Sequence, residues 1–406
     1  MAATGHTHVR RRVSLISSAG LPSVSSQAIA PSGPPSGLDR VVFIDVARVL
    51  ATLMMLLGHT VDALLHTAYR STTAFNAWTF IRGLTPTTFT LVSGFALSLV
   101  ALHVSRRESA RASGSRRLRR FAFFLMIGYA LHYPAANLKG LTMLTTADWR
   151  QFTSVDVLQC IAVTLAVLQI LALQIRDPRR FLVVSGALAI IFCWFTPPVW
   201  TWSSPLPMAL TAYLNPSTGS IFPLFPWLAN GALGAALGAW YLNARGGTPG
   251  SKARRTLLPI GLLMLSAAVV MRLYAWEPFG AVDLGAGRPS QFLLQGGAVC
   301  VLLAGLASLV DLRPVRIPRL EDFAQESLTV YVVHVCIVYG SPWNKGLRQF
   351  LGPSQEPTQV ALFILALWTL MFVLGQSWSA LKRQHPVPAS RLRLVTLGVL
   401  FVLLFV

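Results

Sequence analysis

The sequence predicts an all-α, polytopic integral membrane protein with about eleven transmembrane helices and a cytoplasmic amino terminus. Of its 406 residues, 54% are apolar and only 12% are charged, and the mean hydropathy is positive, at +0.58. A soluble core of this composition would be very unusual. The apolar residues also form runs of roughly 20, the length that an α-helix needs to cross the hydrocarbon core of a bilayer.

The predicted spans follow one another with short connections. They lie near residues 41–65, 77–102, 121–138, 155–175, 181–199, 221–243, 257–275, 291–311, 325–341, 358–380 and 392–406. Residues 1–38 are rich in Ser, Pro and Gly and lack the continuous apolar core of a signal peptide, so we expect a disordered cytoplasmic tail there. Residues 39–406 are expected to form a single transmembrane domain.

The basic residues predict how the helices are oriented. Nearly all Lys and Arg lie in short connections between apolar runs, and every second connection carries them. Short basic loops stay in the cytoplasm. The other connections, near 66–76, 139–154, 200–220, 276–290 and 342–357, are therefore expected to face outward. The formal net charge of +20 then reflects membrane topology, and we expect no nucleic-acid partner although basic stripes are typical of that class.

Several kinds of site are not indicated. The four cysteines fall in separate apolar runs without paired spacing, so neither a disulfide framework nor a metal site is expected; they are Cys160, Cys193, Cys300 and Cys336. The sequence also lacks a Walker loop and a GxSxG nucleophile motif.

The first span carries ionisable side chains, which are costly inside a membrane and mark candidate functional sites. At about 100° per residue, Asp45, Arg48, His59 and Asp62 share one face of the helix, and His66 extends this stripe to the outer surface. Asp45 and Arg48 are candidates for substrate binding or form a neutralising structural pair. His59 and Asp62, one turn apart, predict a dyad in which His59 is a base. A structural, hydrogen-bonded role is the alternative for His59 and equally for His66.

The second span repeats this theme with Arg82. The neighbouring Gly83 and Pro86 are expected to bend the helix and free backbone groups. Arg82 suits an anionic substrate group or a carboxylate such as Asp62, and an anchor at the outer interface is the alternative. Ser93 is a candidate for substrate binding or for close helix packing.

Later spans hold lone polar side chains on apolar helices. His132, Asp156 and His334 are of this kind. His334, one turn from Tyr331, is the best of these candidates for substrate binding, with an interhelical hydrogen bond as the alternative. The stretch "GALGAALG" at 231–238 predicts close helix packing through small residues.

These motifs resemble those of the transmembrane acyltransferase superfamily, which includes the acyltransferase-3 group, with its OpgC-like glucan modifiers, and the heparan-alpha-glucosaminide N-acetyltransferase-like proteins. The stretch "FIDVARVLATLMMLLGH" is similar to that superfamily's Asp-x-x-Arg followed by a His about a span away, and "FTLVSGFAL" is similar to its FxxxSGF signature. "FPLFPWLANGALGAALG" and "ESLTVYVVH" are supporting similarities. They cover most of the chain in the expected order.

The resemblance implies an acyltransferase with no bound cofactor. Acyl-CoA, in particular acetyl-CoA, would enter from the cytoplasm as co-substrate, and a saccharide or other polar acceptor would be acylated toward the outer side. His59 would be the catalytic histidine, with Asp45 and Arg48 at the cytoplasmic start of the first core helix. In the N-acetyltransferase branch the key His lies in the outer loop, where His66 is the nearer match, and Val49 stands where the superfamily usually has Gly.

The sequence thus predicts a multi-pass acyltransferase of the inner (plasma) membrane, and Arg-rich, Lys-poor usage fits a GC-rich bacterium. We expect His59, oriented by Asp62, to take a proton from a hydroxyl or amine that attacks the thioester. Arg48 and Arg82 would bind phosphate or offset developing negative charge, and the connection from Arg106 to Arg120 is a candidate CoA site. Three alternatives stay open: a covalent acyl-histidine, a transporter that uses the same stripe as a proton or substrate relay, and a non-catalytic membrane partner that would tolerate loss of His59.

Overall fold

The computed structural model describes residues 41–103, 107–135, 138–279, 285–312 and 318–385, which are almost entirely helical. The predicted tail at 1–38 and the predicted last span at 392–406 lie outside the described residues. Of the described helices, six are long and apolar enough to cross a membrane: α1 (Val42–Leu64), α2 (Thr73–His103), α5 (Val157–Gln174), α10 (Pro249–Leu273), α11 (Pro289–Leu312) and α15 (Pro357–Gln384). The protein is therefore a multi-pass, all-α membrane protein.

Four further helices coincide with predicted spans. They are α3 (Arg107–Leu131), α6 (Pro178–Trp194), α9 (Leu224–Asn243) and α13 (Ser327–Val338). Each of the first ten predicted spans thus overlaps a helix. The 12 residues of α13 extend over only about 18 Å, less than the hydrocarbon core of a bilayer, so the total of eleven spans stays a prediction.

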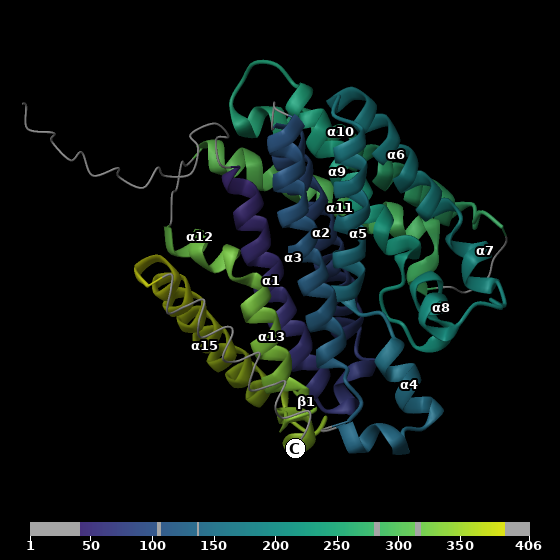
Figure 1. Cartoon of the computed structure of the whole chain (residues 1–406), viewed down its shortest axis with the longest axis vertical. Coiled ribbons are helices and arrows are strands. Elements are labelled where there is room, and N and C mark those ends of the chain that lie inside the picture. Colours follow the sequence, from purple (N-terminus) through teal and green to yellow (C-terminus); the bar gives the residue numbers. More distant parts are fainter. Residues whose placement is uncertain (1–40, 104–106, 136–137, 280–284, 313–317, 386–406) are drawn as a thin grey trace, which may run out of the picture. The chain divides into compact units, whose positions relative to one another are not determined.

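Short elements connect these helices. They are η1 (Thr67–Ser71), η2 (Leu138–Met143), α4 (Thr146–Thr153), α7 (Thr196–Thr201), α8 (Met208–Leu214), η3 (Pro216–Thr218), η4 (Gly285–Gly287), α12 (Pro318–Gln325), β1 (Gly340–Ser341), β2 (Asn344–Lys345) and α14 (Leu347–Leu351). β1 and β2 form a small antiparallel hairpin, with Gly340 opposite Lys345. Figure 1 shows α4 and β1 at one end of the bundle and the start of α10 toward the other. We call the first the pocket end and the second the basic end.

The helix that contains the third predicted span begins well before that span. Its apolar run starts at 121, but α3 begins at Arg107, so most of the basic connection from Arg106 to Arg120 is helical. Arg, Ala and Leu are good helix formers, and hydropathy marks where a helix meets hydrocarbon and not where its hydrogen bonding starts. The candidate CoA connection is therefore mainly the first half of a helix.

The free backbone groups expected around Pro86 stay a prediction, because the carbonyl that Pro86 leaves without a backbone donor is that of Arg82, four residues earlier. α2 continues through Pro86, and the hydroxyls of Thr88 and Thr90 donate to the carbonyls of Leu84 and Pro86 at 2.7 and 2.8 Å. Hydroxyls one turn further along commonly occupy carbonyl groups near a proline inside a membrane helix. These carbonyls are therefore bonded within α2.

Glycines bring α2 and α9 into close contact. A Cβ atom at Gly94 would lie 1.9 Å from the carbonyl oxygen of Gly231, and one at Gly234 would lie 1.9 Å from the carbonyl oxygen of Leu91. No side chain fits at these distances, because the obstacle is backbone. The predicted packing role of 231–238 is confirmed.

This contact gives a first prediction. Gly234→Ala is expected to lower the free energy of unfolding by about 1–3 kcal/mol, because the helices must separate to admit the methyl group. Gly186→Ala on α6 is the matched control, since a Cβ there meets nothing within 4 Å, and it should be neutral or stabilise by up to about 1 kcal/mol. Thermal unfolding in detergent measures both. Equal unfolding temperatures for the two variants would contradict the assignment of this contact.

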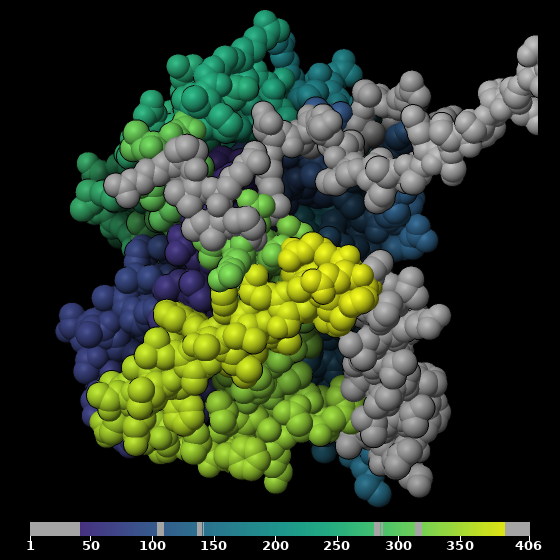
Figure 2. Space-filling view, turned by 90° about the vertical axis from the view of Figure 1, so that its left-hand side faces the viewer, coloured from purple at the N-terminus to yellow at the C-terminus, as the bar shows by residue number. Residues whose placement is uncertain are grey.

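The C-terminal helices pack on the first span. α12, α13 and α15 contact one another and α1, and Phe323, Val330 and Met371 join Leu56 in one buried apolar cluster. In Figure 2, α15 (yellow) lies across this face of the molecule, beside α13 in green. This packing places α13 next to the ionisable stripe of α1.

Candidate active site

A cavity of about 1370 Å³ lies at the pocket end. α1, α2 and α13 supply His59, Arg82 and Tyr331 to its wall, and the end of α3 supplies His132. Further lining residues come from the connections near 139–154, 200–220 and 342–357. Three of the connections predicted to face outward therefore meet at one cavity.

Two histidines form a pair at this cavity. The Nδ1 atom of His59 lies 2.9 Å from the Nε2 atom of His334, and the rings stack with centroids 5.1 Å apart. The Nδ1 atom of His334 lies 2.9 Å from the carbonyl oxygen of Val330. Because a carbonyl only accepts hydrogen bonds, Nδ1 of His334 carries the proton and its Nε2 accepts from Nδ1–H of His59. In two neutral rings, Nε2 of His59 is thus left with a free lone pair.

Asp62 does not orient His59, so the predicted dyad is wrong. Nη1 of Arg82 donates to Oδ1 of Asp62 at 2.8 Å, and Nη2 of Arg82 contacts Oδ2. A planar guanidinium matches both oxygens of a carboxylate, which makes this pairing stronger than one to a neutral imidazole. The alternative prediction, that Asp62 is the carboxylate partner of Arg82, is confirmed.

Two tyrosines hold the histidine pair. The ring of Tyr339 meets His59 edge-on, with centroids 5.5 Å apart, and its hydroxyl donates to the His59 carbonyl at 3.4 Å. The ring of Tyr331 meets His334 edge-on, also at 5.5 Å, and its hydroxyl donates to Oδ2 of Asp156 at 3.2 Å. Oδ1 of Asp156 accepts the first backbone N–H of α5. These contacts hold the rings of His59 on α1 and His334 on α13 in place. Through Tyr331 and Asp156 they also join α13 to the start of α5.

The remaining wall is mixed, and several polar side chains stand among its apolar ones. Nε2 of His132 lies 3.8 Å from Oδ2 of Asp156. The hydroxyl and backbone N–H of Thr145 donate to Asp148 at the start of α4 and lower the pKa of that carboxyl. The guanidinium of Arg348 lies over the Tyr339 ring, 5.9 Å from its centroid. Such a wall suits a polar ligand better than an apolar one.

Three predicted binding residues lie away from the cavity. Asp45 and Arg48 form an ion pair at 3.8 Å near the start of α1, as the structural alternative predicted, and Arg48 is about 16 Å along the helix from His59. Ser93 lies on α2 next to the packing glycine Gly94. None of these three residues lines the cavity.

His66 is not part of the stripe on α1. The helix ends at Leu64, and His66 leaves it because its backbone N–H donates to the carbonyl of Gln355 at 3.0 Å. Its Nδ1 accepts the backbone N–H of Ala68 at 3.1 Å. His66 therefore serves as a local cap and does not line the cavity.

Tyr339 and Arg348 were not identified from the sequence. Tyr339 comes five residues after His334, beyond the turn over which helix-neighbour reasoning extends, and Arg348 lies in a connection. The single tyrosine of "VYG", which follows a lone histidine, was the available signal.

A known family matches the part of the chain that carries several of these residues. The family described as heparan-alpha-glucosaminide N-acetyltransferase, catalytic, matches residues 40–272, more than half of the chain. The chain belongs to this family. This heparan-alpha-glucosaminide N-acetyltransferase-like protein is therefore a membrane acyltransferase. The match contains His59, Asp62 and Arg82, whereas His334 lies beyond it. A comparison with curated proteins found no match.

Proposed function

We propose that this N-acetyltransferase-like protein transfers an acyl group, acetyl in the first place, from acyl-CoA to a hydroxyl or amine of a saccharide or other polar acceptor. The observation that carries the proposal is the free lone pair on Nε2 of His59, whose tautomer is set by His334 and the Val330 carbonyl. A base held in one tautomer at the wall of a polar cavity is what acyl transfer requires.

The proposed reaction uses His59 twice. Its Nε2 accepts the proton of the acceptor hydroxyl or amine as that group attacks the thioester carbonyl. The carbon–sulfur bond then breaks, and the CoA thiolate takes the proton from His59. Arg82, beside His59 on the cavity wall, favours the negative charge that develops on the carbonyl oxygen.

An acyl-histidine variant uses the same lone pair. Nε2 of His59 attacks the thioester and CoA leaves as the thiolate; the acceptor hydroxyl or amine then attacks the acyl carbon, the bond to Nε2 breaks, and the acceptor's proton passes to the thiolate. The two routes differ in whether label from the donor remains on the protein when no acceptor is present. Both need His59 in the tautomer that His334 imposes.

The cavity supports a large acceptor. Its volume of about 1370 Å³ exceeds the roughly 300–1,000 Å³ of common small-molecule sites, which leaves room for more than one sugar ring. We propose that the pocket end faces outward and the basic end faces the cytoplasm of a bacterial cell, because the pocket-end connections hold few basic residues. The donor would then arrive from the basic end.

Release of free CoA from radiolabelled acetyl-CoA tests the proposal. The purified protein in detergent is incubated with acetyl-CoA alone and then with glucosamine as an amino-sugar acceptor. We expect release that rises when the acceptor is added, or labelled protein in its absence. If acetyl-CoA shows neither direct binding nor turnover, the proposal is wrong, and a transporter, which needs a sealed membrane and a gradient, explains the stripe better.

A further inference from the structure

A half-buried arginine, Arg117, and a buried glutamine, Gln169, meet between α3 and α5, toward the basic end. Nε of Arg117 donates to Oε1 of Gln169 at 2.5 Å. Nη2 of Arg117 and Nε2 of Gln169 are buried N–H donors without an acceptor among the residues that the structure describes. The Gln169 side chain is completely buried. Buried donors without acceptors are costly and are rare in native proteins, so this place calls for an acceptor.

The surroundings of these donors are positively charged. The guanidinium of Arg117 is half-buried, and the positive charges of Arg116 and Arg176 lie near enough to act on it. Among the residues that the structure describes, no ion pair joins Arg117 to a carboxylate. Asp177, next to Arg176 in sequence, instead caps α6 by accepting the backbone N–H of Arg180 at 2.9 Å. A neutral acceptor would satisfy the hydrogen bond of Nη2 but would not neutralise the charge of Arg117.

We propose that Arg117 and Gln169, with Arg116 and Arg176 beside them, bind a phosphate group. A phosphate supplies several acceptor oxygens and up to two negative charges, and a guanidinium pairs with two of those oxygens at once. The phosphate that accepts these hydrogen bonds can belong to a nucleotide or to an acidic phospholipid.

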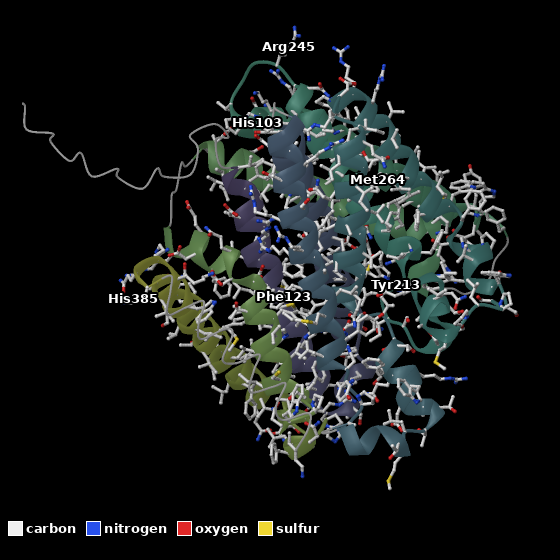
Figure 3. All side chains as sticks on the ribbon, viewed as in Figure 1. His103, Phe123, Tyr213, Arg245, Met264 and His385 are labelled. Atoms are coloured by element: carbon white, nitrogen blue, oxygen red, sulfur yellow. The ribbon has the colours of Figure 1, made fainter. Side chains whose placement is uncertain are left out.

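The distance of the site from the cavity says which nucleotide could reach it. Arg117 precedes His132 of the cavity by 15 residues on and just after α3, which is about 22 Å. Figure 3 shows Phe123 partway along the bundle, with His103 and Arg245 at the basic end. A nucleotide at Arg117 would therefore be the far end of a long donor such as acyl-CoA. That source rests on the proposed function, whereas a lipid headgroup does not.

Adenosine 3′,5′-bisphosphate is the probe for the nucleotide source. Its binding to the purified protein in detergent is measured by calorimetry for the wild type, Arg117→Gln and Arg117→Lys. We expect Arg117→Gln to weaken binding roughly tenfold, as loss of one charged, bidentate contact does, and Arg117→Lys to weaken it less. Arg119→Gln is the matched control, because Arg119 is exposed on the same helix, and it should leave binding within about twofold.

Nanodiscs of phosphatidylglycerol, compared with phosphatidylcholine, test the lipid source. Native mass spectrometry counts the lipids that remain bound to each variant. Retention of phosphatidylglycerol that is lost in Arg117→Gln but kept in Arg119→Gln supports a phosphate site filled by a headgroup. If Arg117→Gln folds with an unchanged unfolding temperature and changes the binding of neither probe, the proposal is overturned.

The outcome separates this site from the proposed function. Probe binding that depends on Arg117, without release of CoA, leaves the phosphate site in place and removes the transferase. A raised KM for acetyl-CoA with unchanged kcat in Arg117→Gln supports both.

Discussion

Replacing His59 with Gln is expected to lower kcat for acyl transfer by about 10²–10⁴-fold, the usual contribution of a general base. Gln can still hydrogen-bond to His334, but it offers no basic nitrogen to the cavity. The Asp62–Arg82 pair is left intact, so the fold should survive. Release of CoA from radiolabelled acetyl-CoA at saturating acceptor measures the loss.

One control variant makes this result specific. His66→Gln should change the rate by less than about twofold, because His66 caps a turn outside the cavity and a surface substitution of this kind has little effect. If His66→Gln is inactive and His59→Gln is active, the reaction takes place at the outer connection that carries His66.

His334 is expected to act through His59. In His334→Gln, the amide oxygen can still accept the Nδ1–H of His59, so the rate should fall less than in His334→Leu. KM should change little in either variant, since His334 positions the base and does not bind substrate. Equal losses in the two variants would mean that His334 has only a structural role.

Hydropathy predicted the order of the helices and some of their limits. The runs at 41–65 and 77–102 correspond to α1 and α2, because apolar residues predominate along each run despite the few ionisable ones. The run at 181–199 is instead divided between α6 and α7. α3 extends beyond its apolar part, since helix formation depends on backbone hydrogen bonds that basic residues also support. Length and polarity alone could not reveal these departures.

The members of the site were easier to predict than their pairing. His59 and Arg82 are conspicuous because ionisable groups inside spans are costly. His59 and His334, however, are 275 residues apart, whereas helix geometry relates only residues three or four apart. Helix geometry therefore predicts Asp62 as the partner of His59, although charge complementarity favours a pair between Asp62 and Arg82. Tertiary packing of α13 on α1 decides the pairing, and no local pattern encodes it.

A buried ion pair fixes the junction that carries α13. Glu326, only 4% exposed, lies between α12 and α13 and pairs with Lys382 of α15. We expect Lys382→Met to lower the free energy of unfolding by about 3–5 kcal/mol, because it leaves a carboxylate buried without its counter-charge. Thermal unfolding in detergent measures the change.

The neighbouring residue provides the matched control. Arg383 pairs with Asp322, but its side chain is 59% exposed, so Arg383→Met should cost at most about 1 kcal/mol. Equal losses for the two variants would show that the burial of Glu326 does not determine how much unfolding free energy is lost. The double variant Glu326→Gln, Lys382→Met should recover part of the loss, because removing both charges leaves no uncompensated one.

The same junction links stability to the active site. α13 begins directly after Glu326 and carries His334 two turns later, so a shift of the junction moves the ring that sets the His59 tautomer. Lys382→Met is therefore expected to lower the rate of CoA release at temperatures where the protein remains folded, whereas Arg383→Met is not. A Lys382→Met protein that is less stable but has the wild-type rate would show that the α13–α1 contact holds His334 in place without the ion pair.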